Sequence, residues 1–228
     1  MPAYNECEII SDIVDEWSEI AINCNGILAI INDGSTDNTL DILKEKFRKH
    51  NKFIIIDKKN SGHGLTCLEG YKWAISNDFK WIFQTDSDGQ TKSNEFVKIW
   101  DQKDNHDFIF GYRNSRGDGI FRWIISRVLR VVIFVVFGVF VKDSNVPFRL
   151  MNKKLLQPII EIIKSDLFLA NALLAVLIQK YHVIKWTPIS FQTRPGGEPS
   201  ITLRRFIPVG LTVTNEFWQI RNIINNDI

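Results

Sequence analysis

The sequence predicts an α/β fold in one domain, with a mostly parallel sheet flanked by helices. Strand-like and helix-like patterns alternate from the start of the chain through Gly111. Short apolar runs such as residues 27–31 lack polar alternation, as expected of parallel strands covered on both faces. Polar loops follow three of these runs, where the carboxyl ends of parallel strands line a shared crevice.

The individual elements follow from periodicity and capping residues. Expected strands cover residues 27–31, 53–56, 82–86, 108–111 and 183–192, with no room for a strand ahead of Pro2. Expected helices cover residues 6–23, 40–50, 65–76, 94–100, 120–141, 153–163 and an amphipathic one at 166–179, with one or two more between residues 203 and 224. Thr36 or Asp37 should cap the second helix, and Asn152 the one that begins at residue 153. Pro147 excludes a helix and favours a short extended segment.

Composition narrows the class of protein. The 228 residues are 45% hydrophobic and 24% charged, which suits one globular domain. No basic and apolar leader opens the chain, and the three cysteines lack metal-like spacing. We therefore expect a protein of a reducing compartment that is not secreted.

Charge is distributed unevenly along the chain. Residues 1–112 hold twelve Lys or Arg against nineteen Asp or Glu, whereas the remaining residues hold sixteen against seven. Ten of the eleven arginines lie from Arg113 onward. This excess predicts an anionic partner: phosphate, a membrane surface or nucleic acid. Nucleic acid is the weakest of these, because the basic residues are interleaved with a long aliphatic run and not with stacking aromatics.

Two carboxylates, Asp86 and Asp88, stand one residue apart at the end of an apolar run. Carboxylates this close repel each other, and a hard divalent ion that also binds phosphate oxygens would offset the repulsion. Gln90 could orient a water or a ligand from the same turn. A solvated turn is the alternative interpretation, because Asp, Ser and Gly are ordinary turn residues.

A glycine-rich stretch, residues 60–64, precedes the helix expected at residue 65. Glycines there let backbone amides approach a ligand, and the helix N-terminus favours an anion. A plain tight turn is the alternative. We expect His63, within this stretch, to shape the backbone or face solvent and not to act as a catalyst.

A strongly apolar stretch covers residues 120–141. Its uninterrupted part, residues 131–141, is eleven residues long, which is short of the ~20 residues that span a bilayer. Basic residues toward one end leave two interpretations, a core helix or a helix at a membrane interface. We favour the interface, because the acidic half of the domain would not otherwise need this basic collar.

Four motifs resemble, in order, those of family 2 glycosyltransferases of GT-A fold: Pro-Ala-Tyr-Asn-Glu (2–6), Asn-Asp-Gly-Ser-Thr-Asp (32–37), Asn-Ser-Gly-His-Gly (60–64) and Asp-Ser-Asp-Gly-Gln (86–90). Residues 111–113, 122–127 and 143–149 resemble the dolichyl-phosphate mannosyltransferase branch and related polyprenyl-phosphate glycosyltransferases. The resemblance covers nearly the whole chain and implies one Rossmann-like GT-A domain over residues 1–228. Residues 1–111 would bind the nucleotide sugar. Residues 112–228 would face the acceptor and the membrane through interfacial helices.

The resemblance also implies roles for individual residues. The nucleotide-sugar pocket would include Pro2, Tyr4, Glu6, Gly62, Asp86 and Ser87, with Asp33 at the base or ribose. Mg or Mn would be held against the donor diphosphate by Asp86, Asp88 and Gln90. Donor or acceptor phosphates would be contacted by Arg113, Arg122 and Arg149. Lipid headgroups would meet Arg127, and a late mobile loop would contain Arg194 and Ser200.

The implied activity is an inverting, metal-dependent transfer of a sugar from a GDP- or UDP-linked donor to a polyprenyl phosphate, by a peripheral enzyme on the cytoplasmic face of a membrane. A divalent ion and arginines would stabilise the charge that builds on the leaving diphosphate. A lipid phosphate is already ionised and needs no general base, whereas a sugar hydroxyl needs a carboxylate, for which Asp143 is the candidate.

Two other activities stay open at this point. The acceptor could be a glycan or a lipid-linked saccharide in surface-polysaccharide synthesis, or the chain could be a catalytically silent nucleotide-sugar-binding subunit. A membrane-protein partner or a homo-oligomer is compatible with each. These alternatives stay open because the sequence departs from the family pattern at three places. The strand that normally precedes Pro2 is missing, the loop over residues 113–122 looks short, and Asn-Val-Pro-Phe at residues 145–148 replaces Ser-Gly-Phe.

Overall fold

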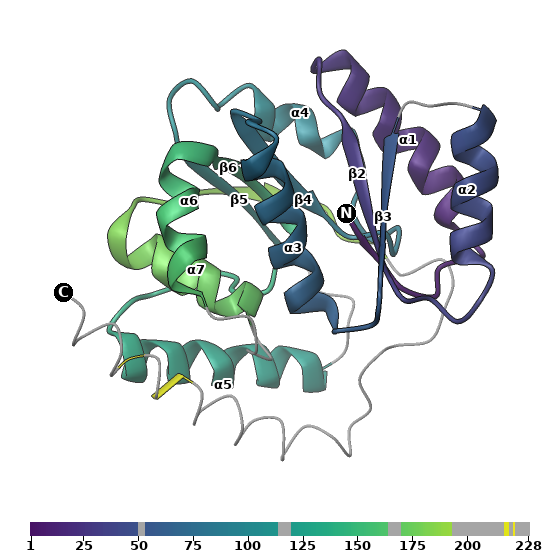
Figure 1. The fold of residues 1–228 in the computed structure, drawn as a ribbon. Coiled ribbons are helices and arrows are strands. Elements are labelled where there is room, and N and C mark those ends of the chain that lie inside the picture. Colours follow the sequence, from purple (N-terminus) through teal and green to yellow (C-terminus); the bar gives the residue numbers. More distant parts are fainter. Residues whose placement is uncertain (50–52, 114–119, 164–169, 193–216, 219–220, 222–228) are drawn as a thin grey trace.

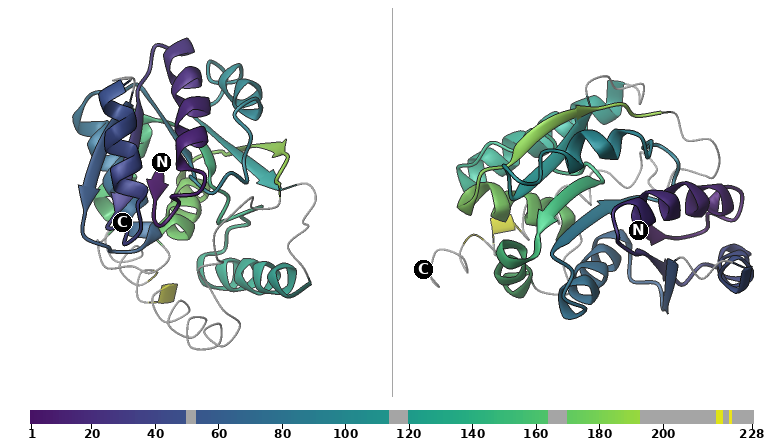
Figure 2. Two further views of the ribbon diagram at one scale, coloured as in Figure 1. Left: turned by 90° about the vertical axis from the view of Figure 1, so that its right-hand side faces the viewer. Right: turned by 90° about the horizontal axis from the view of Figure 1, so that it is seen from above.

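The computed structural model describes residues 1–49, 53–113, 120–163, 170–192, 217–218 and 221, without the side chains of residues 120–126. Within these ranges the strands form two sheets, and helices cover both faces (Figures 1 and 2). The α/β class with a parallel sheet and flanking helices is confirmed.

The first sheet is parallel throughout and has the order β1-β2-β3. Its strands are β1 (Pro2–Ala3), β2 (Leu28–Asp33) and β3 (Phe53–Lys58). The two residues of β1 pair with Ile31 and Asn32, so the start of the chain forms a short strand where none was expected. Asp33 ends β2, and the glycine-rich stretch follows β3, so both loops leave the same edge of the sheet.

The second sheet is mixed and has the order β4-β6-β5-β7. Its strands are β4 (Trp81–Thr85), β5 (Phe108–Arg113), β6 (Phe148–Asn152) and β7 (Lys185–Ile189). The prediction of a mostly parallel sheet missed that β6 runs antiparallel to both of its neighbours. Because Thr85 pairs with Phe148, the turn that precedes β6 lies beside the residues that follow β4.

Helices pack on the two faces of the strands. Figure 2, seen from above, shows α3 (His63–Ser76) and α6 (Lys153–Ile162) on one side, and α1 (Ile10–Asn23) and α4 (Glu95–Trp100) on the other. The helix α2 (Thr39–Lys49) packs on α1 and β3, and α7 (Ala170–Tyr181) packs on α3 and α6. Asp37 caps α2 through a 2.9 Å bond from the Thr39 N–H, and Asn152 caps α6, as predicted.

The helix α7 differs from its prediction as an amphipathic helix. Every residue from Ala170 to Ile178 is buried. The segment contains alanine, leucine, valine and isoleucine on all sides of the helix, and a helix that is apolar all round belongs in a core. The prediction was wrong because the polar residues near residue 166 and after residue 178 lie outside this buried stretch.

The helix α5 (Ile120–Phe137) lies across the end of the molecule at which β3 runs into α3 (Figure 1). One side of α5 packs inward through the buried Ile133 and Val136. Its outward side is also apolar, with Val128, Val131, Phe134 and Val135 between 56% and 64% exposed. No helix in the described ranges combines the length and hydropathy that crossing a bilayer requires.

An apolar cavity of about 280 Å³ lies between β2 and β4, next to the first residue. Met1 donates its amino N–H to the carbonyl oxygen of Ala29 at 2.9 Å, which places it at one end of this cavity. Trp17 of α1 lines the cavity and has a buried indole N–H without a hydrogen-bond partner in the described part of the chain. The strand β1 pairs with Ile31 and Asn32 only, whereas β3 pairs with β2 from Leu28 to Asp33.

Candidate active site

The loop after β2 and the glycine-rich stretch after β3 are joined by Asp33. This carboxylate is 3% exposed and accepts bonds from the backbone N–H groups of Ser61 and Gly62, both at 2.9 Å, and from Lys58. Gly34 has a positive φ of 65°, and a Cβ there would lie 2.6 Å from the Asn60 nitrogen. The amides expected to approach an anionic ligand therefore already bind an anion of the protein itself.

The electrostatics of Asp33 agree with this geometry. Burial by itself raises the pKa of its carboxyl group, but the hydrogen bonds from Lys58 and the Ser61 N–H outweigh burial and leave the pKa below its ordinary value. Asp33 is thus ionised and fixed, and it holds two loops together. Its contact with a base or ribose stays a prediction.

Residues of the N-terminal motif (2–6) also contact the segment that follows β2. Asn5, at a positive φ of 54°, receives the Thr36 N–H at 2.8 Å on its side-chain oxygen and donates its own N–H to Ser35 at 3.1 Å. Glu6 is 8% exposed and donates its N–H to Thr39 at 2.8 Å. Tyr4, between the two buried ends of the motif, is exposed and available to a ligand.

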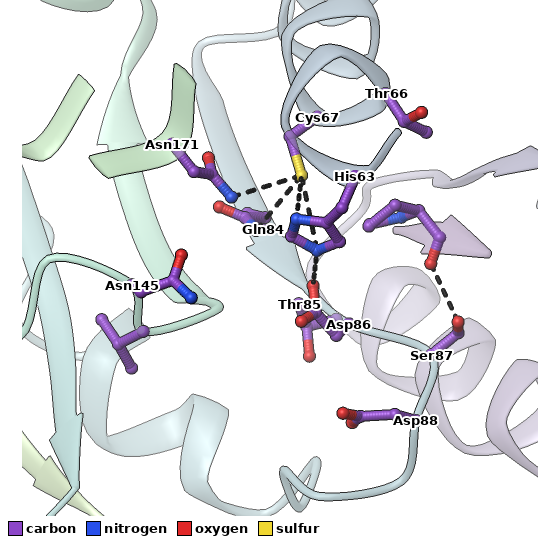
Figure 3. A network of polar contacts seen from close by, with 12 residues as sticks. His63, Thr66, Cys67, Gln84, Thr85, Asp86, Ser87, Asp88, Asn145 and Asn171 are labelled. Atoms are coloured by element: carbon purple, nitrogen blue, oxygen red, sulfur yellow. Dashed lines mark hydrogen bonds and ion pairs between the residues drawn. The ribbon is translucent and has the colours of Figure 1, made fainter. Parts of the chain in front are cut away.

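The tip of β4 carries the two carboxylates. Ser87 points inward, where its hydroxyl donates to the Pro2 carbonyl oxygen at 2.9 Å, so its side chain ties β4 to β1. Asp88 accepts the Gln90 N–H at 3.0 Å across a turn in which Gly89 has a φ of 69°. Figure 3 shows the carboxylates of Asp86 and Asp88 on the side of the turn that faces Asn145.

The carboxylate of Asp86 contacts His63, a contact that the sequence did not predict. His63 begins α3, and its Nε2 lies 2.9 Å from Oδ1 of Asp86 (Figure 3). The nearby Cys67 sulfur and the Asp86 carboxylate raise the pKa of His63 well above its ordinary value. His63 faces solvent in part, as expected, with its side chain 49% exposed, but its contact with Asp86 was not predicted. The sequence did contain a signal for this contact, because His63 and Asp86 follow β3 and β4, which are consecutive strands of the chain.

Gln90 joins the β4 turn to the segment after β7. Its Nε2 donates to the Gln192 carbonyl oxygen at 3.2 Å, and its own carbonyl oxygen accepts the Gln192 N–H at 2.9 Å. The side-chain oxygen of Gln90 is not used in these contacts. Gln90 therefore ties the segment that follows β7 to the turn that carries the two carboxylates.

The end of β5 carries a basic group that pairs with a carboxylate from the turn before β6. Arg113, at the end of β5, forms a fork with Asp143: Nε lies 3.0 Å from Oδ2 and Nη2 lies 3.2 Å from Oδ1. The Arg113 guanidinium also lies over the Phe191 ring at 4.9 Å. Both oxygens of Asp143 therefore accept from Arg113, an arrangement that suits orientation of the guanidinium better than proton abstraction.

The side chain of Arg149 is buried, whereas the resemblance implied that it contacts a phosphate. It is 0% exposed, and it donates to the carbonyl oxygens of Val146, Ser144 and Asn171, each at 2.8 Å. A guanidinium buried in this way cannot reach a phosphate without leaving three carbonyl groups unpaired. Its role in the structure is to hold the turn that carries Asp143.

Four further residues were predicted to belong to the site. Arg194 and Ser200 lie outside the described residues, and so does the side chain of Arg122. Arg127 is exposed on α5. Lys58, which sequence reasoning did not single out, contacts Asp33; its position at the end of a strand, opposite an acidic strand end, was the signal.

The loops after β2 and β3 are joined by Asp33, and those after β3 and β4 by the contact of His63 with Asp86. Ligands of open α/β sheets bind beyond the carboxyl ends of the strands, where these loops lie. Residues 1–164 match the family model described as glycosyl transferase family 2. The chain belongs to glycosyl transferase family 2 and is a glycosyltransferase.

Curated relatives share part of the sequence. An uncharacterized protein of Methanocaldococcus jannaschii is 29% identical over 168 residues, which cover 69% of this chain and 72% of that protein. A UDP-N-acetylglucosamine–dolichyl-phosphate N-acetylglucosaminyltransferase of Methanococcus voltae is 25% identical, with 72% of each chain covered. A dolichyl-phosphate beta-glucosyltransferase of Trichomonas vaginalis is 31% identical over 107 residues, which cover 43% of this chain and 31% of that enzyme.

Solved structures resemble the fold. Glucosyl-3-phosphoglycerate synthase of Mycobacterium tuberculosis aligns with a TM-score of 0.65 and 12% identity, covering 97% of this chain and 78% of that one. The same enzyme in complex with Mn²⁺, uridine diphosphate and glucosyl-3-phosphoglycerate also aligns with a TM-score of 0.65. At this identity the likeness establishes the fold alone.

Proposed function

We propose that the protein transfers a sugar, with inversion, from a nucleotide sugar to a polyprenyl phosphate at a membrane surface, with Mg²⁺ or Mn²⁺ at Asp86 and Asp88. The observation that carries this proposal is the pairing of β4 with the antiparallel β6. This pairing sets the two carboxylates next to the turn that holds the Arg113–Asp143 fork. In this proposal the two carboxylates hold the cation and Arg113 binds an anion beside it.

The residues at the β4 tip fit a divalent ion. Within the described residues no three His, Cys, Asp or Glu side chains form a metal cluster by themselves. Mg²⁺ in phosphate-transfer sites is bound by one or two carboxylates and completes its shell with substrate phosphate and water. Asp86, Asp88 and the unused oxygen of Gln90 supply hard oxygen ligands of this kind. When bound, the ion would neutralise the leaving diphosphate.

The two parts of the chain take different ligands in this proposal. Residues 1–111 would bind the nucleotide sugar, with the exposed Tyr4 beside the base or ribose and the fixed loop at Asp33 forming the floor. Residues 112–228 would bind the acceptor. Arg113, oriented by Asp143, would draw the acceptor phosphate toward the sugar carbon, which is a positioning task between two anions that otherwise repel.

A phosphate acceptor agrees better with the site than a sugar hydroxyl does. A hydroxyl needs a general base, and Asp143, the candidate for that role, has both oxygens committed to Arg113. An ionised phosphate needs none. Two relatives are named for dolichyl phosphate as acceptor, which supports the same choice.

The outward apolar side of α5 supports a membrane surface as partner. It exposes valine and phenylalanine at the end of the molecule where the site loops lie (Figure 1), and Arg127 is exposed on the same helix. A helix whose exposed side is apolar, with basic residues toward one end, suits the headgroup region of a bilayer. The enzyme would then meet a lipid-linked acceptor at the cytoplasmic face.

The test is a donor panel. Purified protein is incubated with UDP-glucose, UDP-N-acetylglucosamine or GDP-mannose, with Mn²⁺ or Mg²⁺, and with a short-chain polyprenyl phosphate. We expect one donor to give a lipid-linked monosaccharide of inverted anomeric configuration, and chelation or Asp88→Ala to abolish it. Donor binding without transfer to any phosphate, glycan or lipid-linked saccharide would support the silent-subunit alternative instead.

A further inference from the structure

The Asp86 carboxylate at the tip of β4 is held by a side chain from a different element. His63 is the first residue of α3, and its Nε2 lies 2.9 Å from Oδ1 of Asp86. Figure 3 shows the imidazole ring between Asp86 and the sulfur of Cys67. The His63 side chain is 49% exposed and that of Asp86 is 20% exposed. The pair therefore lies at the border between the core and the crevice.

Four buried side chains form a chain of polar contacts beside the His63 ring: Tyr71, Gln84, Asn171 and Cys67. The Tyr71 hydroxyl lies 2.5 Å from Oε1 of Gln84 and 3.1 Å from Oδ1 of Asn171. Since these oxygens face Tyr71, the amide nitrogens of Gln84 and Asn171 face the other way, and each lies 3.4 Å from Sγ of Cys67. The sulfur thus accepts two N–H groups from opposite elements and is fixed in place.

The carboxylate of Asp86 determines the role of the ring nitrogen Nε2. Sγ of Cys67 lies 4.0 Å from Nδ1 and 3.9 Å from Nε2 of His63. A carboxylate only accepts hydrogen bonds, so Nε2 carries a hydrogen and donates to Asp86. The sulfur is almost equidistant from the two ring nitrogens, so it limits where the ring can lie without selecting either nitrogen. Nε2 donates to Asp86 whether the ring is neutral or charged.

We propose that His63 is a positioning residue that sets the orientation of Asp86 toward the donor diphosphate and its divalent ion. The proposal rests on the proposed function, because it concerns the same site. With Oδ1 bound to His63, rotation of the carboxylate is restricted and Oδ2 is the oxygen presented to a ligand. Cys67, Gln84 and Asn171 keep the ring in the rotamer that makes this contact.

The test compares UDP binding with and without Mn²⁺ by calorimetry, in wild type, His63→Ala, His63→Gln and a control, His106→Ala, which lies before β5 at the opposite end of the sheet. Outer partners of metal-ligating groups change metal affinity 10–100-fold, so we expect His63→Ala to lose about tenfold or more of the Mn²⁺-dependent gain in UDP affinity. UDP affinity without metal and the unfolding midpoint should stay at wild-type values. His63→Gln keeps an N–H near the position of Nε2 and should recover most of the gain.

The outcomes separate the two proposals. An equal Mn²⁺-dependent gain in wild type and His63→Ala would overturn the role of His63 and leave the proposed function intact. A His63→Gln variant as impaired as His63→Ala would also contradict a role through the Nε2 hydrogen. Wild-type protein without any Mn²⁺-dependent gain would overturn the metal-dependent function, and the role of His63 with it.

Discussion

Arg113 and Asp143 form a two-pronged ion pair across β5 and the turn before β6, with N–O distances of 3.0 and 3.2 Å. Their side chains are 15% and 6% exposed. The pair lies where the antiparallel β6 meets the end of β4 that carries Asp86 and Asp88. A guanidinium held in this way is oriented before any ligand arrives, which lowers the cost of positioning a phosphate.

The first prediction concerns Asp143. Asp143→Asn keeps the shape of the side chain and one acceptor oxygen, so Arg113 should stay in place and turnover should fall by less than about tenfold. Loss of a general base would cost about 10²–10⁴-fold. Initial rates at saturating acceptor decide between the two roles. A loss at the upper end of that range, with a changed pH profile, would show that Asp143 is the base and that the acceptor is a hydroxyl.

The second prediction concerns Arg149. Arg149→Met fills a similar volume but leaves the carbonyl oxygens of Ser144, Val146 and Asn171 unpaired in the core. We expect the free energy of unfolding, measured in urea, to fall by about 2–5 kcal/mol. The exposed Arg48→Met variant should change it by less than about 0.5 kcal/mol. A stable Arg149→Met protein with weakened phosphate binding would restore the direct role that the family resemblance implied.

The third prediction concerns pH and Asp33. The folded-state pKa of this carboxyl lies below its ordinary value, so the unfolded chain takes up a proton at higher pH than the folded chain does. Its contribution to stability is therefore present above the unfolded pKa of ~3.9 and is lost as pH falls through the folded pKa.

Asp33→Asn should accordingly be less stable than wild type at pH 7, and the difference should shrink below about pH 4. Urea titrations at both pH values measure it, with the exposed Asp101→Asn as the matched control. A difference between wild type and Asp33→Asn that stays constant through the acid range would contradict an ionised, hydrogen-bonded Asp33.

The fourth prediction concerns α5. Val131 is 61% exposed and Val135 is 64% exposed, one turn apart on the outward side. Val131→Asp or Val135→Asp should lower binding to vesicles of phosphatidylcholine and phosphatidylglycerol by roughly tenfold or more, since burying one valine contributes about 1.5 kcal/mol or more. Sedimentation with vesicles gives the partition coefficient.

The matched control for α5 is Val183→Asp. Val183 is 82% exposed and lies ahead of β7, at the opposite end of the sheet from Arg113. The Val183→Asp substitution should leave vesicle binding unchanged. Equal effects of the α5 and Val183 substitutions, or no effect of either, would remove α5 as the membrane contact.

Much of the fold could be predicted because its signals are local. The apolar runs at β2, β3, β4 and β5 and the caps Asp37 and Asn152 are readable from neighbouring residues alone. The short extended segment expected after Pro147 is the strand β6, but its antiparallel direction was not predicted. Its pairing with β4 and β5 depends on residues far away in sequence, which no local pattern encodes.

The candidate site could also be predicted only in part. That Asp86 and Asp88 leave a strand end beside the other polar loops follows from strand and loop order. The inward orientation of Arg149 and Ser87 does not, because one residue along a strand reverses the face that a side chain occupies. The contact of His63 with Asp86 joins residues 23 apart in sequence, so it required the packed α3 and β4.

We propose that Asp86 and Asp88 hold a divalent ion against a nucleoside diphosphate, near Arg113. Crystals soaked with Mn²⁺ and UDP would show this through anomalous diffraction from manganese. We expect one manganese peak within bonding distance of an Asp88 oxygen and of the UDP phosphates, with Asp86 beside it and the base near Tyr4. Manganese and UDP bound away from these carboxylates, or UDP bound here in the same pose without the ion, would contradict it.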